Sequence, residues 1–319
     1  MAHRRWTQKD IPSQRGKTIL TTGLGELGYE CALALSLAGG YVIIADPSEK
    51  AGERAVSRIK AFYSAAKVEH DHVELSNLES IGKLADRLAL RRGKIDILVN
   101  AANAFTPATR HSTTDGLELQ FGANYIGHFA LTAKLMPLLR RAARPRVVSL
   151  SSVMALGGRI NFDDLQAEAE YRPLFAYCQS KLACLIFAQE LQRRSDAMDW
   201  GITSLAAHTG ILRTELLHNA PGRLGARGLA RSYLWLMSQP AARGALPTLF
   251  AATSPSARAG GFYGPDGVAG MRGFPTELPL PDSAGNLDVA ARLWNVSETL
   301  SGISFGMSDI DPVSTNQEI

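Results

Sequence analysis

The segment between Lys17 and Ala38 places the strongest constraint on the fold. It begins with a short apolar, β-branched run that ends at Thr22, continues through the turn Gly23-Leu-Gly-Glu-Leu-Gly28, and ends in an apolar helical stretch. A G-x-G-x-x-G spacing between a strand and a helix lets the backbone turn tightly, and it presents the helix N-terminus to a pyrophosphate. The segment therefore predicts a dinucleotide-binding unit, with a purely structural turn as the open alternative. The residues expected to contact the dinucleotide here are Gly23, Gly25, Glu26, Leu27 and Gly28.

The second apolar run, Tyr41-Val-Ile-Ile-Ala-Asp46, predicts another buried strand, and Asp46 at its end stands 18 residues after Gly28. A carboxylate there can accept hydrogen bonds from the ribose hydroxyls of an adenosine and would repel a 2′-phosphate. No Arg or Lys follows directly in the sequence. The predicted cofactor is therefore NAD, with NADP less favoured. Asp46 could instead cap the following helix, a role that Ser48 would fill equally well.

Strand-like runs alternate with helical segments along most of the chain. This alternation predicts an α/β fold, a doubly wound parallel sheet (Rossmann fold) with right-handed crossovers, in which ligands collect at the carboxyl ends of the strands. No linker or repeat divides the sequence, so we predict a single domain over residues 17–303, with tails at 1–16 and 304–319. Residues 259–286 are rich in Gly and Pro, and no element is predicted there. The predicted helices cover residues 49–64, 78–91, 116–143 and 289–300, and the predicted strands cover 68–75, 95–100, 146–152 and 202–206.

The segment Phe175-Ala-Tyr-Cys-Gln-Ser-Lys181 lies in a run predicted to be helical, where residues four apart share a face. Tyr177 and Lys181 would therefore point the same way. A lysine cation beside a phenol favours the phenolate and lowers a pKa that is about 10 without such a neighbour. The pair predicts a group that transfers protons near neutral pH. The spacing alone is common on solvated helix faces, so the prediction depends on the rest of the pattern.

The composition argues against several classes of function. A net charge of +4 over 319 residues, with basic residues scattered along the chain, gives little support to nucleic-acid binding. Cys31, Cys178 and Cys184 have no metal-ligand spacing and are odd in number, so we expect reduced thiols in a cytoplasmic protein and no metal. Because the sequence has no apolar window of about 18 residues and no apolar core near Met1, we expect neither a membrane span nor a secretion signal.

Residues 209–240 differ from the rest in their frequent Gly and Arg and in the apolar run Tyr233-Leu-Trp-Leu-Met237. Because they follow a predicted strand end, we interpret them as a lid over the site, with a core segment or a subunit contact as the equal alternative. Arg223, Arg227 and Arg231 are interpreted as a solvated face, with recognition of an acidic substrate or surface as the less favoured alternative.

Several further fragments occur in an order that resembles the short-chain dehydrogenase/reductase family, and within it the retinol-dehydrogenase-like branch. The resemblance covers about Lys17 to Ile303. Each fragment alone is unspecific, but the set is highly specific. The fragments are Asp96-Ile-Leu-Val-Asn100, Asp115-Gly-Leu-Glu-Leu-Gln-Phe-Gly-Ala-Asn124, Gly127-His-Phe129, Arg146-Val-Val-Ser-Leu-Ser-Ser152, Asn161-Phe-Asp-Asp-Leu165, Phe175-Ala-Tyr-Cys-Gln-Ser-Lys181 and Arg292-Leu-Trp-Asn-Val296.

The resemblance implies a catalytic tetrad of Asn124, Ser152, Tyr177 and Lys181. It makes Tyr177 the general base in alcohol oxidation and the general acid in carbonyl reduction, and Ser152 would form a hydrogen bond to the reacting oxygen. Lys181 would lower the pKa of Tyr177 and hold the nicotinamide ribose, and Asn124 would anchor a water of the proton relay. A homodimer or homotetramer paired through the long helices is also implied. The other implied cofactor contacts are Glu74 at the adenine, Asn100, Ala101, Gly210 and Leu212 along the cofactor, and Thr214 at the nicotinamide carboxamide.

Four positions depart from the family's pattern, all on the cofactor side. The glycine loop is one residue shorter, with Glu26 where the middle glycine would align, and a carboxylate there repels a diphosphate unless its side chain points away. Asn103 introduces a side chain where the family has none, Glu74 replaces an Asp, and Thr209 replaces a proline. These changes bear on the affinity and seating of the cofactor more than on the chemistry.

The leading hypothesis is an NAD-dependent oxidoreductase that interconverts a fairly large, lipophilic alcohol and its ketone or aldehyde, with Tyr177 as general acid and base. The long loop before Tyr177 and the apolar run 233–237 motivate this substrate class. The alternative is a non-catalytic, nucleotide-sensing or scaffold protein on the same fold, motivated by the altered glycine loop and Asn103. A sugar-nucleotide epimerase or dehydratase also shares Tyr-x-x-x-Lys, but it usually has a larger C-terminal substrate domain.

Overall fold

The computed structural model describes residues 5–104, 107–213 and 237–305. Its strands are β1 (Thr18–Thr22), β2 (Tyr41–Ala45), β3 (Lys67–Asp71), β4 (Ile97–Asn100), β5 (Arg146–Leu150), β6 (Thr203–Ala207), β7 (Phe262–Pro265) and β8 (Pro275–Glu277). They form one sheet in the order β3-β2-β1-β4-β5-β6-β7-β8. Strands β1 to β7 run parallel, and β8 pairs antiparallel with β7.

The strand order reverses at β1, because the chain first adds β2 and β3 on one side and then continues with β4 on the other. This topology confirms the predicted doubly wound α/β fold. The longer helices are α1 (Glu26–Leu37), α2 (Glu49–Phe62), α3 (Leu78–Arg91), α4 (Gly127–Lys134), α6 (Pro173–Ala197), α10 (Leu246–Thr253) and α12 (Leu287–Ser301). The short ones are η1 (Gln8–Asp10), the π-helix η2 (Phe121–Ile126), α5 (Met136–Leu139), η3 (Val153–Gly157), α9 (Ala241–Gly244), η4 (Val268–Gly270) and α11 (Asp282–Gly285).

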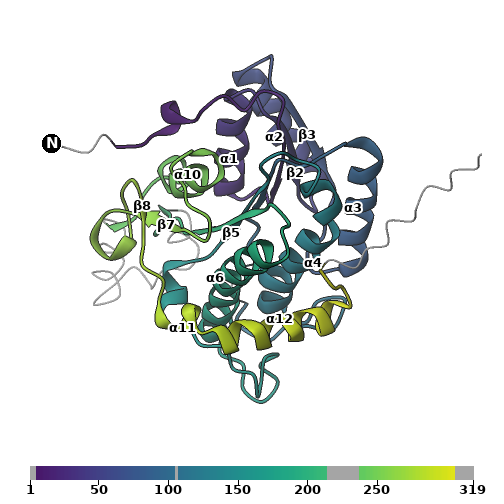
Figure 1. Cartoon of the computed structure of the whole chain (residues 1–319), viewed down its shortest axis with the longest axis vertical. Coiled ribbons are helices and arrows are strands. Elements are labelled where there is room, and N and C mark those ends of the chain that lie inside the picture. The colour runs from purple at the N-terminus through teal and green to yellow at the C-terminus, as the bar shows by residue number, and fades with distance from the viewer. Residues whose placement is uncertain (1–4, 105–106, 214–236, 306–319) are drawn as a thin grey trace, which may run out of the picture.

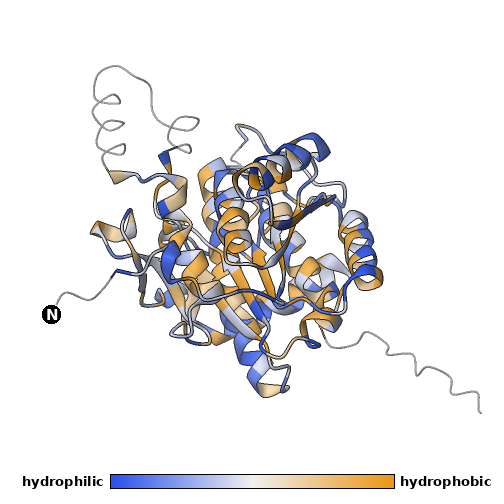
Figure 2. Ribbon diagram, turned by 90° about the horizontal axis from the view of Figure 1, so that it is seen from above, coloured by the Kyte–Doolittle hydropathy of each residue, from blue (hydrophilic) through white to orange (hydrophobic). Residues whose placement is uncertain are grey.

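Helices cover both faces of the sheet (Figure 1). On one face α1, α2 and α10 bury an apolar cluster that includes Leu35, Ile59 and Leu249. On the other face α3, α4, α6 and α12 enclose a larger cluster that includes Phe129 and Trp294. Apolar residues gather between these layers and polar residues lie on the outside (Figure 2). The two clusters hold the sheet rigidly, so the loops at the carboxyl ends of its strands have fixed starting points.

Helix α3 has the limits that its sequence predicts. Its buried residues Ile81, Leu84, Ala85 and Leu88 follow the i, i+3, i+4, i+7 spacing of an amphipathic helix. The helix begins after Asn77, whose side-chain oxygen accepts a hydrogen bond from the Ser80 N–H at 3.0 Å. Such N-caps satisfy a backbone donor that has no partner inside the helix.

Two regions differ from the sequence prediction. The expected helix over 116–143 instead begins near residue 119, passes through the π-helix η2 and divides at Leu135 into α4 and α5. Glu118 caps its start, because its carboxylate accepts hydrogen bonds from two backbone N–H groups of that first turn. Residues 259–286, for which no element was predicted, contain β7 and β8. These strands form because β7 pairs with β6 and β8 pairs with β7, and these tertiary contacts outweigh the weak local propensity of Gly and Pro.

Within the described ranges, none of the helices combines the length and apolar content needed to cross a bilayer. The predicted lid lies mostly outside the described residues, which leave out Arg223, Arg227, Arg231 and residues 233–236 of the apolar run. Its two described ends meet in a parallel bridge between Leu212 and Gln239.

Candidate active site

A cavity of about 460 Å³ lies at the carboxyl ends of the parallel strands, where the strand order reverses between β1 and β4. This is the place where doubly wound sheets bind ligands. Asn100 and Asn124 are buried beside the cavity without lining it, and Thr214 lies outside the described residues. The predicted site residues that line the cavity are Gly23, Gly25, Glu26, Leu27, Gly28, Asp46, Glu74, Ala101, Ser152, Tyr177, Lys181, Gly210 and Leu212.

The three glycines of the turn between β1 and α1 have different roles. Gly23 has a φ of +83°, a conformation that L side chains rarely adopt. A Cβ atom on Gly28 would lie 2.1 Å from the Gly23 carbonyl oxygen, so a side chain there is incompatible with the turn. A Cβ on Gly25 would meet no protein atom within 4 Å, because this residue faces the cavity at the N-terminus of α1. The turn therefore leaves open the space into which a pyrophosphate would fit.

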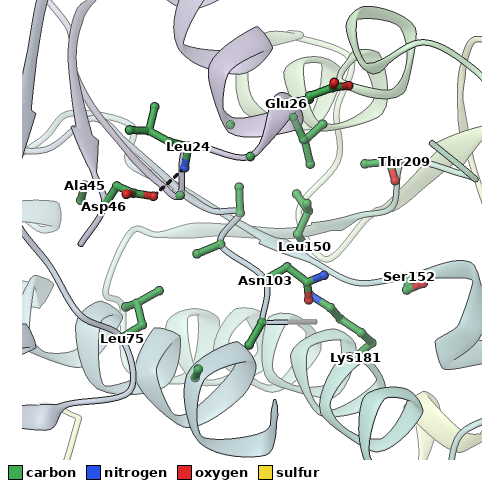
Figure 3. Close-up of a pocket in the computed structure, with 18 of the residues that line it drawn as sticks. Leu24, Glu26, Ala45, Asp46, Leu75, Asn103, Leu150, Ser152, Lys181 and Thr209 are labelled. Carbon is green, nitrogen blue, oxygen red and sulfur yellow. Dashed lines mark hydrogen bonds between the residues drawn. The ribbon is translucent and has the colours of Figure 1, made fainter. Parts of the chain in front are cut away.

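Glu26 does not block this space. It is the first residue of α1 and is exposed. In Figure 3 its carboxylate lies at the rim of the cavity, away from Asp46, Asn103 and Lys181. Together with burial, Glu26 raises the pKa of Glu30, which stands one helical turn further along α1. Its charge is thus directed along the outside of α1, away from the space into which a diphosphate would fit.

Asp46 ties the end of β2 to the glycine turn. Its Oδ2 accepts a hydrogen bond from the Leu24 N–H at 2.9 Å, drawn as a dashed line in Figure 3. Its Oδ1 accepts one from the Ser48 N–H at 2.9 Å. The Ser48 hydroxyl, in turn, accepts from the Ala51 N–H at 3.3 Å and so caps α2. Ser48, and not Asp46, is therefore the N-cap of α2. Asp46 keeps lone pairs for a ligand, since a carboxylate has about four acceptor sites.

Ser152, Tyr177 and Lys181 line the same cavity from β5 and α6. Ser152 follows β5 directly, and its hydroxyl accepts a hydrogen bond from the Met154 N–H at 3.2 Å. Tyr177 is half-buried on α6, and the Lys181 Nζ lies 5.9 Å from the centre of its ring. Lys181 itself is only 2% exposed. The predicted i, i+4 placement of phenol and ammonium on one helix face is thus present in the structure.

Asn124 belongs to the π-helix η2 and is fully buried. Its Oδ1 accepts a hydrogen bond from the Ala104 N–H at 2.6 Å, and its Nδ2 donates to the Ser180 hydroxyl at 3.2 Å. Its backbone carbonyl accepts from His128 Nδ1 at 2.8 Å and from the Cys184 thiol at 3.2 Å. Asn124 therefore joins the loop after β4 to α6. The water-anchoring role that the resemblance implies for it stays a prediction.

The remaining predicted contacts have mixed positions. Glu74 lines the cavity, but its Oε1 already accepts hydrogen bonds from the hydroxyl and N–H of Ser76, at 2.7 and 3.1 Å. Asn100 is buried and donates to the Thr132 hydroxyl at 3.1 Å, so its role is in the protein interior. Gly210 has a φ of +67° and donates its N–H to His208 Nδ1 at 3.1 Å.

Two polar residues at the site carry no motif that could have revealed their roles. Asn103 lines the cavity without closing it, and its buried amide oxygen has no hydrogen-bond partner among the described residues. Gln239 is buried; its amide nitrogen donates to the Thr209 carbonyl at 2.7 Å, and its amide oxygen accepts from the Gly273 N–H at 2.9 Å. Its partners are distant in sequence, so only the folded chain reveals them.

We expect the protein to lose stability in mild acid because of two buried histidines. Burial lowers the pKa of both His128 and His208 to about 4, from 6.5. Since the folded pKa lies below the unfolded one, the neutral forms contribute fully above about pH 6.5, and this contribution is lost as the pH falls toward 4. The loss is about 3 kcal/mol per histidine at most. Thermal melts should therefore show Tm falling over this window.

The matched variants are His208→Asn and, as the control, His111→Gln at an exposed position. The first should reduce the fall in Tm between pH 6.5 and 4, and the second should leave the curve as in wild type. A wild-type Tm that is constant across this window would contradict the prediction.

The fold and the cavity together define a class: doubly wound α/β proteins with a dinucleotide-type cleft that also holds a serine, a tyrosine and a lysine. The protein-family model described as "short chain dehydrogenase" matches residues 17–223 of this chain. Human retinol dehydrogenase 13 is 34% identical over 294 residues, covering 90% of this chain and 85% of its own length. Human polyprenol dehydrogenase is 34% identical over 251 residues, with 77% and 75% covered.

Among solved structures, an uncharacterised protein from Mycobacterium paratuberculosis superimposes with a TM-score of 0.77 at 34% identity, covering 95% of this chain and 99% of its own. The chain therefore belongs to the short-chain dehydrogenase/reductase family, in its retinol-dehydrogenase-like branch. It is an oxidoreductase that acts on CH–OH groups, and enzymes of this family use NAD or NADP.

Proposed function

We propose that this enzyme uses NAD to interconvert a lipophilic alcohol and its ketone or aldehyde, with Tyr177 as the general acid and base. The observation that carries the proposal is a single cavity lined by the glycine turn, Asp46, Ser152, Tyr177 and Lys181. The first two provide a seat for a dinucleotide, and the last three provide groups for a proton transfer. The position of the Glu26 carboxylate at the rim of the cavity supports cofactor binding, because its charge lies away from the space for a diphosphate.

In the direction of reduction, the Ser152 hydroxyl donates a hydrogen bond to the carbonyl oxygen, and the Tyr177 phenol gives that oxygen its proton. The Lys181 cation stabilises the phenolate that remains, since a positive charge close to a phenol favours its ionised form. The nicotinamide, when bound, supplies or accepts the hydride. In alcohol oxidation the Tyr177 phenolate takes the proton back. The buried position of Lys181 supports this role, because low local polarity strengthens its electrostatic effect.

The preference for NAD rests on the charge of Asp46 beside the ribose position. We expect wild type to bind NADH at least about tenfold more tightly than NADPH, a difference of about 1.4 kcal/mol. Asp46→Asn retains an acceptor for the Leu24 N–H but removes the charge, so the preference should disappear. Fluorescence titration of the purified protein with both nucleotides measures this.

Two comparison variants make the titration selective. Asp46→Ala removes the hydrogen bond and the charge together, and Glu49→Ala removes a nearby exposed carboxylate that does not line the cavity. The second should behave as wild type. An unchanged preference in Asp46→Asn would show that the discrimination lies elsewhere. If neither nucleotide binds at millimolar concentration, the scaffold alternative takes first place.

The substrate class is supported by the surface next to Ser152 and Tyr177. Met154 and Leu156 on η3, and Leu174 and Phe175 at the start of α6, are apolar and exposed. These two elements pack against each other. The curated relatives are named for retinol and polyprenol, both long apolar alcohols. A screen of steroids, retinoids, polyprenols and aryl carbonyls with NAD and NADH tests the class, and turnover confined to small polar alcohols would overturn it.

We further propose that residues 17–303 form one domain with residues 209–240 as its lid, that residues 1–16 and 304–319 are tails, and that the protein is a cytoplasmic homodimer or homotetramer. The family match over 17–223 supports the domain. The assembly rests on the family resemblance, and light scattering on the purified protein tests it. Cell fractionation tests the location.

A further inference from the structure

His128 is a buried titratable residue to which the proposed chemistry assigns no role. It lies on α4 and is 4% exposed. One ring nitrogen, Nδ1, is 2.8 Å from the Asn124 carbonyl oxygen. The other, Nε2, is 2.9 Å from the Thr22 hydroxyl at the end of β1. The ring therefore connects two structural elements that both border the candidate active site.

These contacts determine where each proton lies. The Asn124 carbonyl can only accept, so Nδ1 carries the proton and Nε2 has the lone pair. The Thr22 hydroxyl accepts hydrogen bonds from the N–H groups of Ala101 and Ala102, at 2.9 and 3.0 Å, which occupy its two lone pairs. Its own proton then points to Nε2. The Val99 carbonyl competes for this proton only at 3.5 Å. One tautomer and one hydroxyl orientation thus satisfy every donor and acceptor.

Both ends of this connection reach the site. At the Thr22 end, Ala101 and Ala102 line the cavity on the side expected to hold the cofactor. At the Asn124 end, the Asn124 amide bonds to Ser180, and Ser180 donates to the Tyr177 carbonyl at 2.8 Å on the helix that carries Tyr177 and Lys181. Burial and, to a smaller extent, the Lys181 cation lower the pKa of the His128 imidazole, which agrees with a neutral ring.

We propose that His128 is a positioning residue that fixes the cofactor wall and the catalytic helix relative to each other, through one arm to Thr22 and one arm to Asn124. The proposal rests on the proposed function for its effect on catalysis. The connection itself is a property of the fold and can be measured without substrate. Because the two hydrogen bonds start from different ring nitrogens, a substitution can remove one of them and keep the other.

Two substitutions test the arms individually. His128→Asn places an amide donor near the position of Nδ1 and keeps the bond to the Asn124 carbonyl, but it cannot reach Thr22. His128→Gln places an amide oxygen near the position of Nε2 and keeps the acceptor for Thr22, but it loses the Asn124 carbonyl. The control is Tyr125→Phe. Tyr125 follows Asn124 in η2, and the substitution removes the buried hydrogen bond between its hydroxyl and the Ser297 hydroxyl, which is 2.6 Å long.

Hydrogen–deuterium exchange and thermal melts are measured on all four proteins, together with NADH affinity and kcat at saturating NADH. His128→Asn should accelerate exchange in peptides covering 97–104 and weaken NADH binding about tenfold, with kcat within threefold of wild type. His128→Gln should accelerate exchange in peptides covering 119–129 and lower kcat about tenfold, with NADH affinity within threefold. Tyr125→Phe should lower Tm, and any change in NADH affinity and in kcat should be by the same factor.

The outcomes distinguish this proposal from the proposed function. If both His128 variants change NADH affinity and kcat by one common factor, as Tyr125→Phe does, then His128 contributes stability only and the proposal is wrong. If wild type binds no nucleotide, the proposed function is wrong, but the exchange pattern still decides about His128. Identical exchange in His128→Asn and His128→Gln would then overturn the two-arm connection.

Discussion

The Tyr177→Phe variant is expected to lose a factor of about 10²–10⁴ in kcat, the range that general acid–base catalysis typically contributes. Phenylalanine keeps the ring, which lines the cavity beside Lys181, and removes only the hydroxyl that would exchange a proton with the substrate. The affinity for NADH should therefore stay within about twofold of wild type, a change of less than 1 kcal/mol. Steady-state kinetics with the best substrate of the screen, together with NADH titration, measure both quantities.

The control for this experiment is Tyr171→Phe. Tyr171 lies just before α6, and its hydroxyl donates to the Pro107 carbonyl at 3.2 Å and accepts from the Gln120 amide at 3.1 Å. Its removal should cost stability but not turnover. If Tyr177→Phe turned over substrate at the wild-type rate, Tyr177 would not be the proton-transfer group. A large loss of NADH affinity would instead show that the hydroxyl is needed to seat the cofactor.

The second large effect is expected at the glycine turn, where Gly25→Ala and Gly28→Ala should fail in different ways. Gly25 has φ −54° and ψ 163°, which alanine also adopts, and its Cβ would meet no protein atom within 4 Å. The added methyl group would occupy the space left for the pyrophosphate. Because overpacking costs about 1–3 kcal/mol, NADH affinity should fall about 10- to 100-fold. Tm should change by only a few degrees.

In Gly28→Ala the new Cβ would lie 2.1 Å from the Gly23 carbonyl oxygen, so the backbone of the turn has to move. We expect a fall in Tm of about 5 °C or more, together with loss of NADH binding. Calorimetry and NADH titration on both variants separate the two effects. If Gly25→Ala bound NADH as tightly as wild type, no phosphate group would lie above this turn, and the seat proposed for the cofactor would be wrong.

Local sequence patterns predicted those parts of the site that lie on one segment of chain. The i, i+4 relation of Tyr177 and Lys181, the glycine turn and the position of Asp46 after β2 all follow from spacing within single elements. The two roles considered for Asp46 could not be separated in this way, because the choice depends on the Leu24 N–H and on Ser48. The role of Asp46 depends on the contact between the loop after β2 and the glycine turn, which the sequence does not show.

The parts that could not be predicted depend on distant residues. The π-helix η2 has no clear sequence signature, and its start is stabilised by Glu118, whose carboxylate caps the first turn. Strand β7 (Phe-Tyr-Gly-Pro) contains Gly and Pro and no β-branched residue, and its pairing with β6 on one side and β8 on the other compensates. In the sequence His128 is one residue of a family fragment and has no assigned role. The role proposed for it depends on Thr22, which is 106 residues away in the sequence.

The two outer strands of the sheet have a consequence for self-association. One edge is β3, whose sequence Lys-Val-Glu-His-Asp is largely charged or polar, and the other is β8, which has three residues and begins with Pro275. Charged side chains, short length and proline are the features by which natural sheets resist strand addition from another molecule. Two copies of this chain are therefore not expected to join their sheets edge to edge. Subunits that pair would have to do so through helices or loops, and both edges protect the protein against β-type aggregation at high concentration.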